Sequence, residues 1–244
     1  MRWSNMKHIH KIGVELEGAW LTRRSDMKGD GSVRISGRDH YITKVGHFVT
    51  PAQNPKHNSL REGELNSPAG RIDQILSYIK DNYPDAVNNS CGLHVHFSFK
   101  SPNAYVLLAG VEFYNYFHDQ LSEWGKSKKI KQDHSFWTRL AGRNEFCDGD
   151  PSENLRCLQE EGDRYYALNF SSYHKHKTME CRVLPMFETA QLSLEAVHAV
   201  VSIVEQYLDQ QFNTFLTQKE FTCTIEKDVA EYYLEVEMPE AVCV

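Results

Sequence analysis

Two segments of the chain alternate strictly between apolar and polar residues. Residues 9–20 read IHKIGVELEGAW, and every second residue from Ile12 to Leu16 is apolar. Residues 91–99 read CGLHVHFSF, and here the apolar positions run from Leu93 to Phe99. Successive side chains of a strand point to opposite sides. Both segments are therefore predicted to be strands with one apolar face and one polar face.

Three further segments have the composition of strands, at residues 61–66, 164–171 and 178–184. A hairpin loop over residues 171–177 is expected to join the last two. The region from residue 21 to residue 63 is rich in Gly, Asp, Asn, Ser and Pro, which favours loops and short strands. Residues 125–150 are polar and are expected to be irregular.

Four segments predict helices. Ser67 and Pro68 form a good helix start, with Ser67 as the N-cap and Pro68 at the first helical position. Apolar residues then recur at helical spacing from Ile72 to Ile79, which indicates an amphipathic helix. The other helices are predicted at residues 102–124, 152–162 and 191–212.

Strands that return through hairpins, combined with irregularly placed helices, indicate an α+β fold. We expect a curved antiparallel β-sheet with helices packed on its apolar face. A chain of 244 residues is long enough to bury one well-filled core. We predict one domain over residues 1–217, followed by an acidic C-terminal extension over residues 218–244 that packs on it or trails from it.

Composition narrows the class of protein. The chain is 41% apolar and 25% charged, as ordinary globular proteins are. It has no apolar run near the roughly 20 residues that span a bilayer, and its first residues lack the apolar core of a secretory signal. We therefore expect a cytoplasmic protein without a membrane partner.

Charge and cysteine spacing exclude two further classes of function. The net charge of −6 argues against a broad nucleic-acid-binding surface. A nucleic-acid partner is therefore not expected, and nucleic acid stays open only as a substrate. The basic run from Lys126 to Lys131 is interpreted as a solvated surface, with a phosphate contact as the lesser option, and so is the segment from His174 to Lys177. The six cysteines form no Cys-x-x-Cys pair, so a zinc ribbon is unsupported and mostly buried thiols are expected.

The polar faces of the predicted strands carry side chains suited to metal ions and phosphate. Two residues apart on one strand, such groups share a face and lie about 7 Å apart. Crowded carboxylates repel one another unless cations offset their charge. Carboxylate oxygens suit Mg²⁺ or Mn²⁺, and arginine suits phosphate. The residues concerned are Glu15, Glu17, Glu64, His94, His96, Asn169, Thr178, Glu180 and Arg182, with Arg164 at a strand edge.

None of these signals is specific alone, since one Glu-x-Glu or His-x-His pair is common on an exposed strand. Their order along the chain is more specific, because it resembles the amidoligase family. That family belongs to the glutamine synthetase-like carboxylate–amine ligases and is related to glutamate–cysteine ligase. The motifs, between Ile12 and Phe187, are GVELEG, GDGS, GELNSP, GLHVHFS, RYYALNF and TMECRVLP. The family's last motif usually reads Glu-Phe-Arg; here Cys181 takes the middle position on the apolar face, where the change concerns packing.

The resemblance implies a glutamine synthetase-like fold and an enzyme that uses ATP to form an amide. Two or three divalent ions, Mg²⁺ or Mn²⁺, would be bound by Glu15, Glu17, Glu64, His94 and Glu180. His96 would hold phosphate or substrate, and Arg182 would contact the transferred phosphoryl group. The family also tends to carry arginines at the positions of Arg139, Arg143 and Arg164, which would hold ATP or an acyl phosphate. The side of the site that takes the acid or the amine would be shaped by Asp30, Ser32 and Asn169, with Asp30 as a proton acceptor.

In the implied mechanism, a substrate carboxylate attacks the γ-phosphorus of ATP, and an amine then displaces phosphate from the acyl phosphate. Magnesium would neutralise charge on the moving phosphoryl group. Two other classes of function stay open. One is a metal-dependent hydrolase or phosphotransferase that uses the same Glu/His face, and the other is a non-catalytic module that binds a nucleotide or another phosphorylated ligand.

Overall fold

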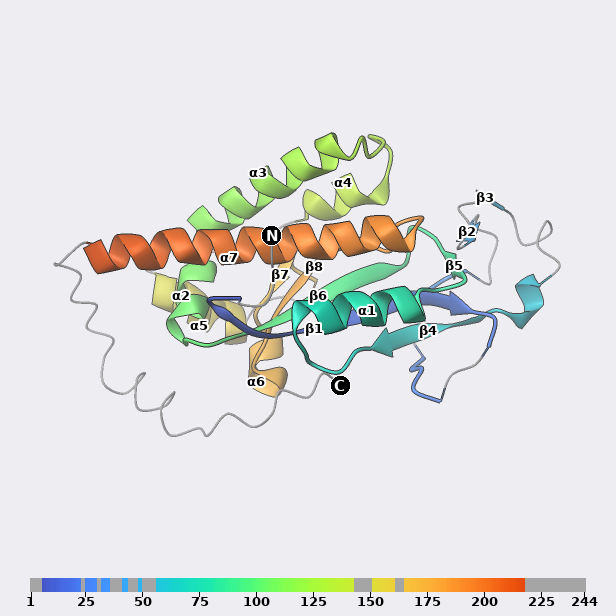
Figure 1. Cartoon of the computed structure of the whole chain (residues 1–244), viewed down its shortest axis with the longest axis horizontal. Helices are drawn as coiled ribbons and strands as arrows, with labels where there is room; N and C mark the ends of the chain where they lie inside the picture. The colour runs from blue at the N-terminus through green and yellow to red at the C-terminus, as the bar shows by residue number, and fades with distance from the viewer. Residues whose placement is uncertain are drawn as a thin grey trace.

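The computed structural model of the chain describes residues 6–22, 25–29, 32–35, 41–43, 48–49, 56–142, 151–160 and 165–217. Within these residues eight strands form one sheet, and every pairing between them is antiparallel (Figure 1). The order is β3-β2-β5-β1-β6-β8-β7, and β4 also pairs with β1. The strands are β1 (Ile9–Trp20), β2 (Tyr41–Thr43), β3 (Phe48–Val49), β4 (Arg61–Asn66), β5 (Ala86–Val87), β6 (Gly92–Phe99), β7 (Leu168–Asn169) and β8 (Met179–Pro185).

Helices complete an α+β architecture, so the predicted α+β class and antiparallel sheet are confirmed, while the glutamine synthetase-like form of that sheet stays a prediction. The first helix, α1, lies against β1 and against the last helix, α7, while α3 lies against α7 and α4 contacts β8 (Figure 1). None of these described helices has the length and apolar character required to cross a membrane. The helices are α1 (Ile72–Asn82), α2 (Asn103–Leu108), α3 (Val111–Ser127), α4 (Ser135–Leu140), α5 (Pro151–Glu160), α6 (Ser172–His176) and α7 (Ala190–Thr217), with a 3₁₀ turn at His57–Ser59.

A row of leucines crosses the centre of the sheet. Leu16 on β1 lies opposite Leu65 on β4 and Leu93 on β6, and Leu93 lies opposite Leu184 on β8. All four side chains are fully buried. Burying a leucine contributes about 2 kcal/mol through the hydrophobic effect, so this row holds four strands in one register. That register in turn decides which polar residues meet on the opposite face.

The start of the first helix differs from the prediction. Helix α1 begins at Ile72, and Ser67 is not its cap. The Ser67 N–H donates to the Val14 carbonyl, and the Val14 N–H donates to Ser67 Oγ at 2.9 Å. Ser67 therefore continues the pairing between β1 and β4, because its hydroxyl satisfies a strand donor instead of a helix donor.

Other boundaries differ because tertiary packing overrides local signals. The helix predicted at 102–124 is two helices, α2 and α3, separated at Ala109–Gly110, and the segment predicted to be irregular contains α4. The predicted strand at 164–171 is reduced to the two residues of β7, and the predicted hairpin loop contains the short helix α6. Helix α7 extends to Thr217, five residues beyond the predicted end at 212. The predicted C-terminal extension lies outside the described residues.

Candidate functional site

The register of the sheet gathers the predicted polar residues on one face. On β1, Glu15 lies opposite His94 of β6 and Asn66 of β4. Side chains of directly opposite residues in an antiparallel pair lie on the same face. The same rule joins three further pairs to this face, which are Glu17 with Glu64, His96 with Glu180, and Glu180 with Asn169.

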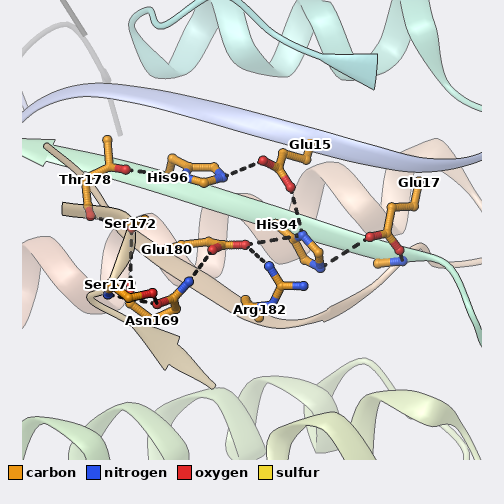
Figure 2. Close-up of polar contacts among 11 residues, drawn as sticks. Glu15, Glu17, His94, His96, Asn169, Ser171, Ser172, Thr178, Glu180 and Arg182 are labelled. Carbon is orange, nitrogen blue, oxygen red and sulfur yellow. Dashed lines mark hydrogen bonds and ion pairs between the residues drawn. The ribbon is translucent and has the colours of Figure 1, made fainter. Parts of the chain in front are cut away.

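His94 is the centre of this face (Figure 2). Its Nδ1 lies 3.0 Å from Glu15 Oε2 and 3.4 Å from Glu180 Oε1. Its Nε2 lies 3.8 Å from Glu17 Oε1. One imidazole on β6 therefore stands among three carboxylates that β1 and β8 supply from either side.

His96 holds the other oxygen of Glu15. Its Nε2 lies 3.0 Å from Glu15 Oε1, and its Nδ1 lies 3.3 Å from Thr178 Oγ1. Both ring nitrogens thus have partners, so the ring orients the Glu15 carboxylate toward His94. Burial opposes ionisation of Glu15, but the hydrogen bonds to His94 and His96 outweigh it and hold the pKa of this carboxyl well below its usual range. Burial lowers the pKa of His96, yet the hydrogen bond to Glu15 and the negative charges of Glu180 and Glu15 together outweigh burial, so the pKa of His96 is raised.

Asn169 holds the third carboxylate in a similar way. Its Nδ2 donates to Glu180 Oε2 at 2.7 Å. Its Oδ1 accepts from the Ser171 N–H at 2.9 Å and from Ser171 Oγ at 2.6 Å (Figure 2). The amide is buried and bonded at both ends, so Asn169 fixes Glu180 instead of projecting freely.

Two arginines border the cluster. Arg182 donates to Glu180 Oε1, and its guanidinium lies 5.9 Å from the ring centroid of Tyr165, an exposed side chain. Arg139 on α4 reaches the carbonyl oxygens of Asn89 and Ser90 at 3.4 and 3.3 Å. Both arginines therefore lie on the side of the face formed by β6, β8 and α4.

Gly92 has no side chain, and this allows the side chains of His94, Glu17 and Arg139 to approach its backbone closely. Its N–H donates to Glu17 Oε2 at 2.5 Å. A Cβ at this position would lie 2.5 Å from His94 Nε2, 3.0 Å from Glu17 Oε2 and 3.2 Å from the Arg139 guanidinium. The space that a side chain would need is therefore occupied by three functional groups, which is a reason for glycine at the start of β6.

The donor set fits one divalent cation. Glu15, His94 and Glu180 each offer a ligand atom, and these atoms lie within 4.8 Å of one another. Ligand atoms around Mg²⁺ lie about 3–4 Å apart at metal–oxygen distances of about 2.1 Å, so small side-chain shifts suffice. Carboxylates suit Mg²⁺ and Mn²⁺, and the imidazole nitrogen suits transition metals such as Mn²⁺.

The structure accounts for most of the predicted site residues. It brings eight of them together, which are Glu15, Glu17, His94, His96, Arg139, Asn169, Glu180 and Arg182. Glu64 shares their face through its pairing with Glu17, and Ser32 is exposed. Asp30, Arg143 and Arg164 lie outside the described residues, so their roles stay predictions.

Sequence reasoning gave no role to three residues that shape this face. Ser171 bonds Asn169, Gly92 leaves the space described above, and Asn66 lies beside Glu15. Thr178 was expected on the polar face, and the structure shows that it bonds His96. Alternation along β4 was enough to place Asn66, because it follows Glu64 by two residues. The contacts of Ser171 and Thr178 depend on the turn into α6, for which the sequence carried no clear signal.

The cysteines and the basic run outside the cluster have the structural roles that the sequence predicts for them. Cys91 and Cys181 are buried free thiols, and burial raises the pKa of each to about 12. In the basic run, Lys126 pairs with Glu123 and Lys128 pairs with Glu195 at 2.7 Å each. Both lysines therefore take part in ion pairs at the surface.

Comparison of the chain with protein-family models, with curated proteins and with solved structures gave no match. The family resemblance of the motifs therefore stays a prediction. A function is therefore inferred first from the chemistry of the residues that the sheet brings together.

Proposed function

We propose that the protein is an ATP-dependent carboxylate–amine ligase that forms an amide through an acyl phosphate, on a glutamine synthetase-like sheet. The observation that carries the proposal is His94 between Glu15 and Glu180, with Arg182 bonded to the same Glu180 carboxylate. Acidic ligands suit a divalent cation, and an adjacent guanidinium suits the phosphate that such a cation accompanies. The order of motifs along the chain supports the same class of reaction.

Glu15, His94 and Glu180 would hold a divalent cation, and Glu17 with Glu64 would extend the acidic row beside them. When bound, the cation supplies charge neutralisation for the phosphates of ATP. Glu15 and Glu180 arrive already oriented, because His96 and Asn169 each hold one carboxylate oxygen. Preorganised groups of this kind cost little reorganisation during reaction.

Arg182 and Arg139 would bind the transferred phosphoryl group and the nucleotide from the other side. A substrate carboxylate oxygen attacks the γ-phosphorus, the bond to ADP breaks, and ADP leaves. The amine nitrogen then attacks the acyl carbon, phosphate leaves, and the amine gives up a proton. The role of the chain in these steps is positioning and electrostatic stabilisation, which dominate phosphoryl transfer.

The proposal is tested by incubating the full chain with ATP, Mg²⁺ or Mn²⁺, and a panel of acids and amines. ADP, phosphate and the mass of any amide are followed together. We expect ADP and amide in equal amounts, and loss of turnover in Glu15→Gln. The matched control is Glu123→Gln, which changes an exposed carboxylate on α3 and is expected to keep wild-type turnover.

The other two classes of function predict different outcomes in the same assay. A hydrolase would release product without ATP, and this result would reject the ligase. A phosphotransferase would give a stable phosphorylated acceptor, and no amide would form. Nucleotide binding without any turnover across the panel would favour a non-catalytic module.

A further inference from the structure

Asn66 presents an unpartnered amide to the candidate site. On β4, Leu65 pairs with Leu16 in the core, and the next residue, Asn66, pairs with Glu15 on the site face. Its Nδ2 and Oδ1 are both buried, and neither has a hydrogen-bond partner in the part of the chain that the structure describes. A buried amide without partners costs free energy, so such groups call for a specific explanation.

Asn169 provides an internal comparison. It lies on the same face, at the β7 edge, and both ends of its amide are bonded to Glu180 and Ser171. Asn169 therefore has a structural task that is complete within the chain. Asn66, on the far side of Glu15, has the same chemistry and no such task, which is the pattern expected of a group that bonds a ligand.

The surroundings of Asn66 define what that ligand can be. The arginines Arg139 and Arg182 lie near β6 and β8, whereas the strand of Asn66 contributes Glu64 to the same face and lies beside Glu15. A cationic or N–H-rich group is attracted to the acidic side, and anions are attracted to the arginines. An amide oxygen accepts an N–H, which leaves the lone pair of an amine free to react.

We propose that Asn66 marks the amine subsite and that its Oδ1 accepts an N–H from a primary amine substrate. The inference rests on the proposed ligase function and assigns one of its two substrates to the β4 side of the site. Lys28 pairs with Glu64 through two backbone hydrogen bonds and brings residues 25–29 to the outer edge of β4, so this segment borders the proposed subsite.

The first test measures binding and needs no turnover. Thermal unfolding of the full chain is followed with Mg²⁺ and ADP present while methylammonium chloride is titrated. Tetramethylammonium chloride is the control, because it carries the charge but no N–H. We expect a saturable stabilisation by methylammonium alone, and its loss in Asn66→Leu. Equal responses to the two salts, or an unchanged response in Asn66→Leu, would overturn the inference whether or not the protein is a ligase.

The second test distinguishes an effect on amine binding from effects on stability and on metal affinity. Asn66→Leu removes the amide at similar volume, so the ligand-free Tm is expected to rise by about 2–4 °C and Mn²⁺ affinity to stay within twofold. With an acid and amine that the wild type joins, KM for the amine is expected to rise at least tenfold. Hydroxylamine, a small and strong nucleophile, is expected still to give hydroxamate. An unchanged KM for the amine, or a lost Mn²⁺ affinity, would reject the assignment.

Discussion

The Glu15 carboxylate lies 3.0 Å from His94 through Oε2 and 3.0 Å from His96 through Oε1. Both oxygens of one partly buried carboxylate are thus held by two imidazoles that stand two residues apart on the neighbouring strand. His94 also approaches Glu180 and Glu17, whereas His96 turns to Thr178. The two histidines of one His-x-His pair consequently have different tasks, one central to the cluster and one that orients its ligand.

Replacement of Arg182 should separate metal binding from turnover. Arg182→Gln removes a cation that bonds Glu180, so the affinity for Mn²⁺ is expected to stay the same or increase. Turnover is expected to fall about 10²–10³-fold, because a charged donor to the phosphoryl group is lost. Isothermal titration with Mn²⁺ and an ADP-release assay measure the two effects. A matching loss of both would instead make Arg182 a structural partner of Glu180.

Replacement of Asn169 should weaken metal binding, although Asn169 itself is not one of the proposed metal ligands. Asn169→Leu removes the N–H that donates to Glu180 Oε2, and partners of this kind change metal affinity about 10–100-fold. Electron paramagnetic resonance of free Mn²⁺ gives the affinity. Ser171→Ala is the control, since the Ser171 N–H still bonds Asn169, and its affinity is expected to fall less. Unchanged Mn²⁺ affinity in Asn169→Leu would contradict a positioning role.

Gly92→Ala should damage the site more than the fold. The new Cβ would displace His94 Nε2, Glu17 Oε2 and the Arg139 guanidinium, which are ends of flexible side chains. We expect a loss in stability of about 1 kcal/mol or less and a loss of Mn²⁺ affinity of at least tenfold. Urea unfolding and Mn²⁺ titration of the same preparation give both numbers. Large destabilisation with unchanged Mn²⁺ affinity would instead mean that glycine is required at position 92 for the backbone of β6 and not for the site.

The pair of Glu188 and His134 should contribute an acid-sensitive part of the stability. His134 Nε2 lies 3.2 Å from Glu188 Oε1, and this bond outweighs partial burial and lowers the pKa of Glu188 below its ordinary value of 4.5. A group with a lowered folded-state pKa stabilises fully above that ordinary value, and the contribution is lost as pH falls through the folded-state pKa. Glu188→Gln is therefore expected to lose less stability than the wild type between pH 6 and pH 3.

The expected difference is small, about 0.5 kcal/mol, because Glu188 is about one-third exposed and solvent screens the pair. Urea unfolding at several pH values measures it, with Glu123→Gln as a surface control. Parallel pH profiles for the wild type and Glu188→Gln would exclude this pair as a source of acid sensitivity.

Strict alternation made the central strands predictable. The polar faces of β1 and β6 follow from the spacing of Glu15, Glu17, His94 and His96, and the structure confirms their meeting. Cross-strand register decides which residues are neighbours, and apolar alternation excludes a shift by one residue but not a shift by two, which keeps every side chain on its face. For this reason the bonds from Asn169 to Glu180 and from His96 to Glu15 were outside the reach of sequence reasoning.

Short elements were the least predictable part. The helix α6 and the two-residue strand β7 depend on side-chain bonds near the turn, such as Ser172 Oγ to the Thr178 carbonyl at 2.6 Å. Ser67 looked like a helix cap because its local sequence suits that role, but the edge of β1 offered a competing partner. Local propensity decides such positions only where tertiary contacts do not.

In the proposed reaction, a carboxylate oxygen of the acid substrate is transferred to phosphate during amide formation. The most direct test uses the acid that proves active, with both carboxylate oxygens labelled with ¹⁸O, in unlabelled water. Phosphate is collected after complete turnover and its mass is measured. We expect one ¹⁸O atom in each phosphate released with an amide, because the bridging oxygen of the acyl phosphate leaves with phosphorus. Phosphate without label, in the presence of amide or of a hydrolysed product, would contradict the acyl phosphate and with it the ligase.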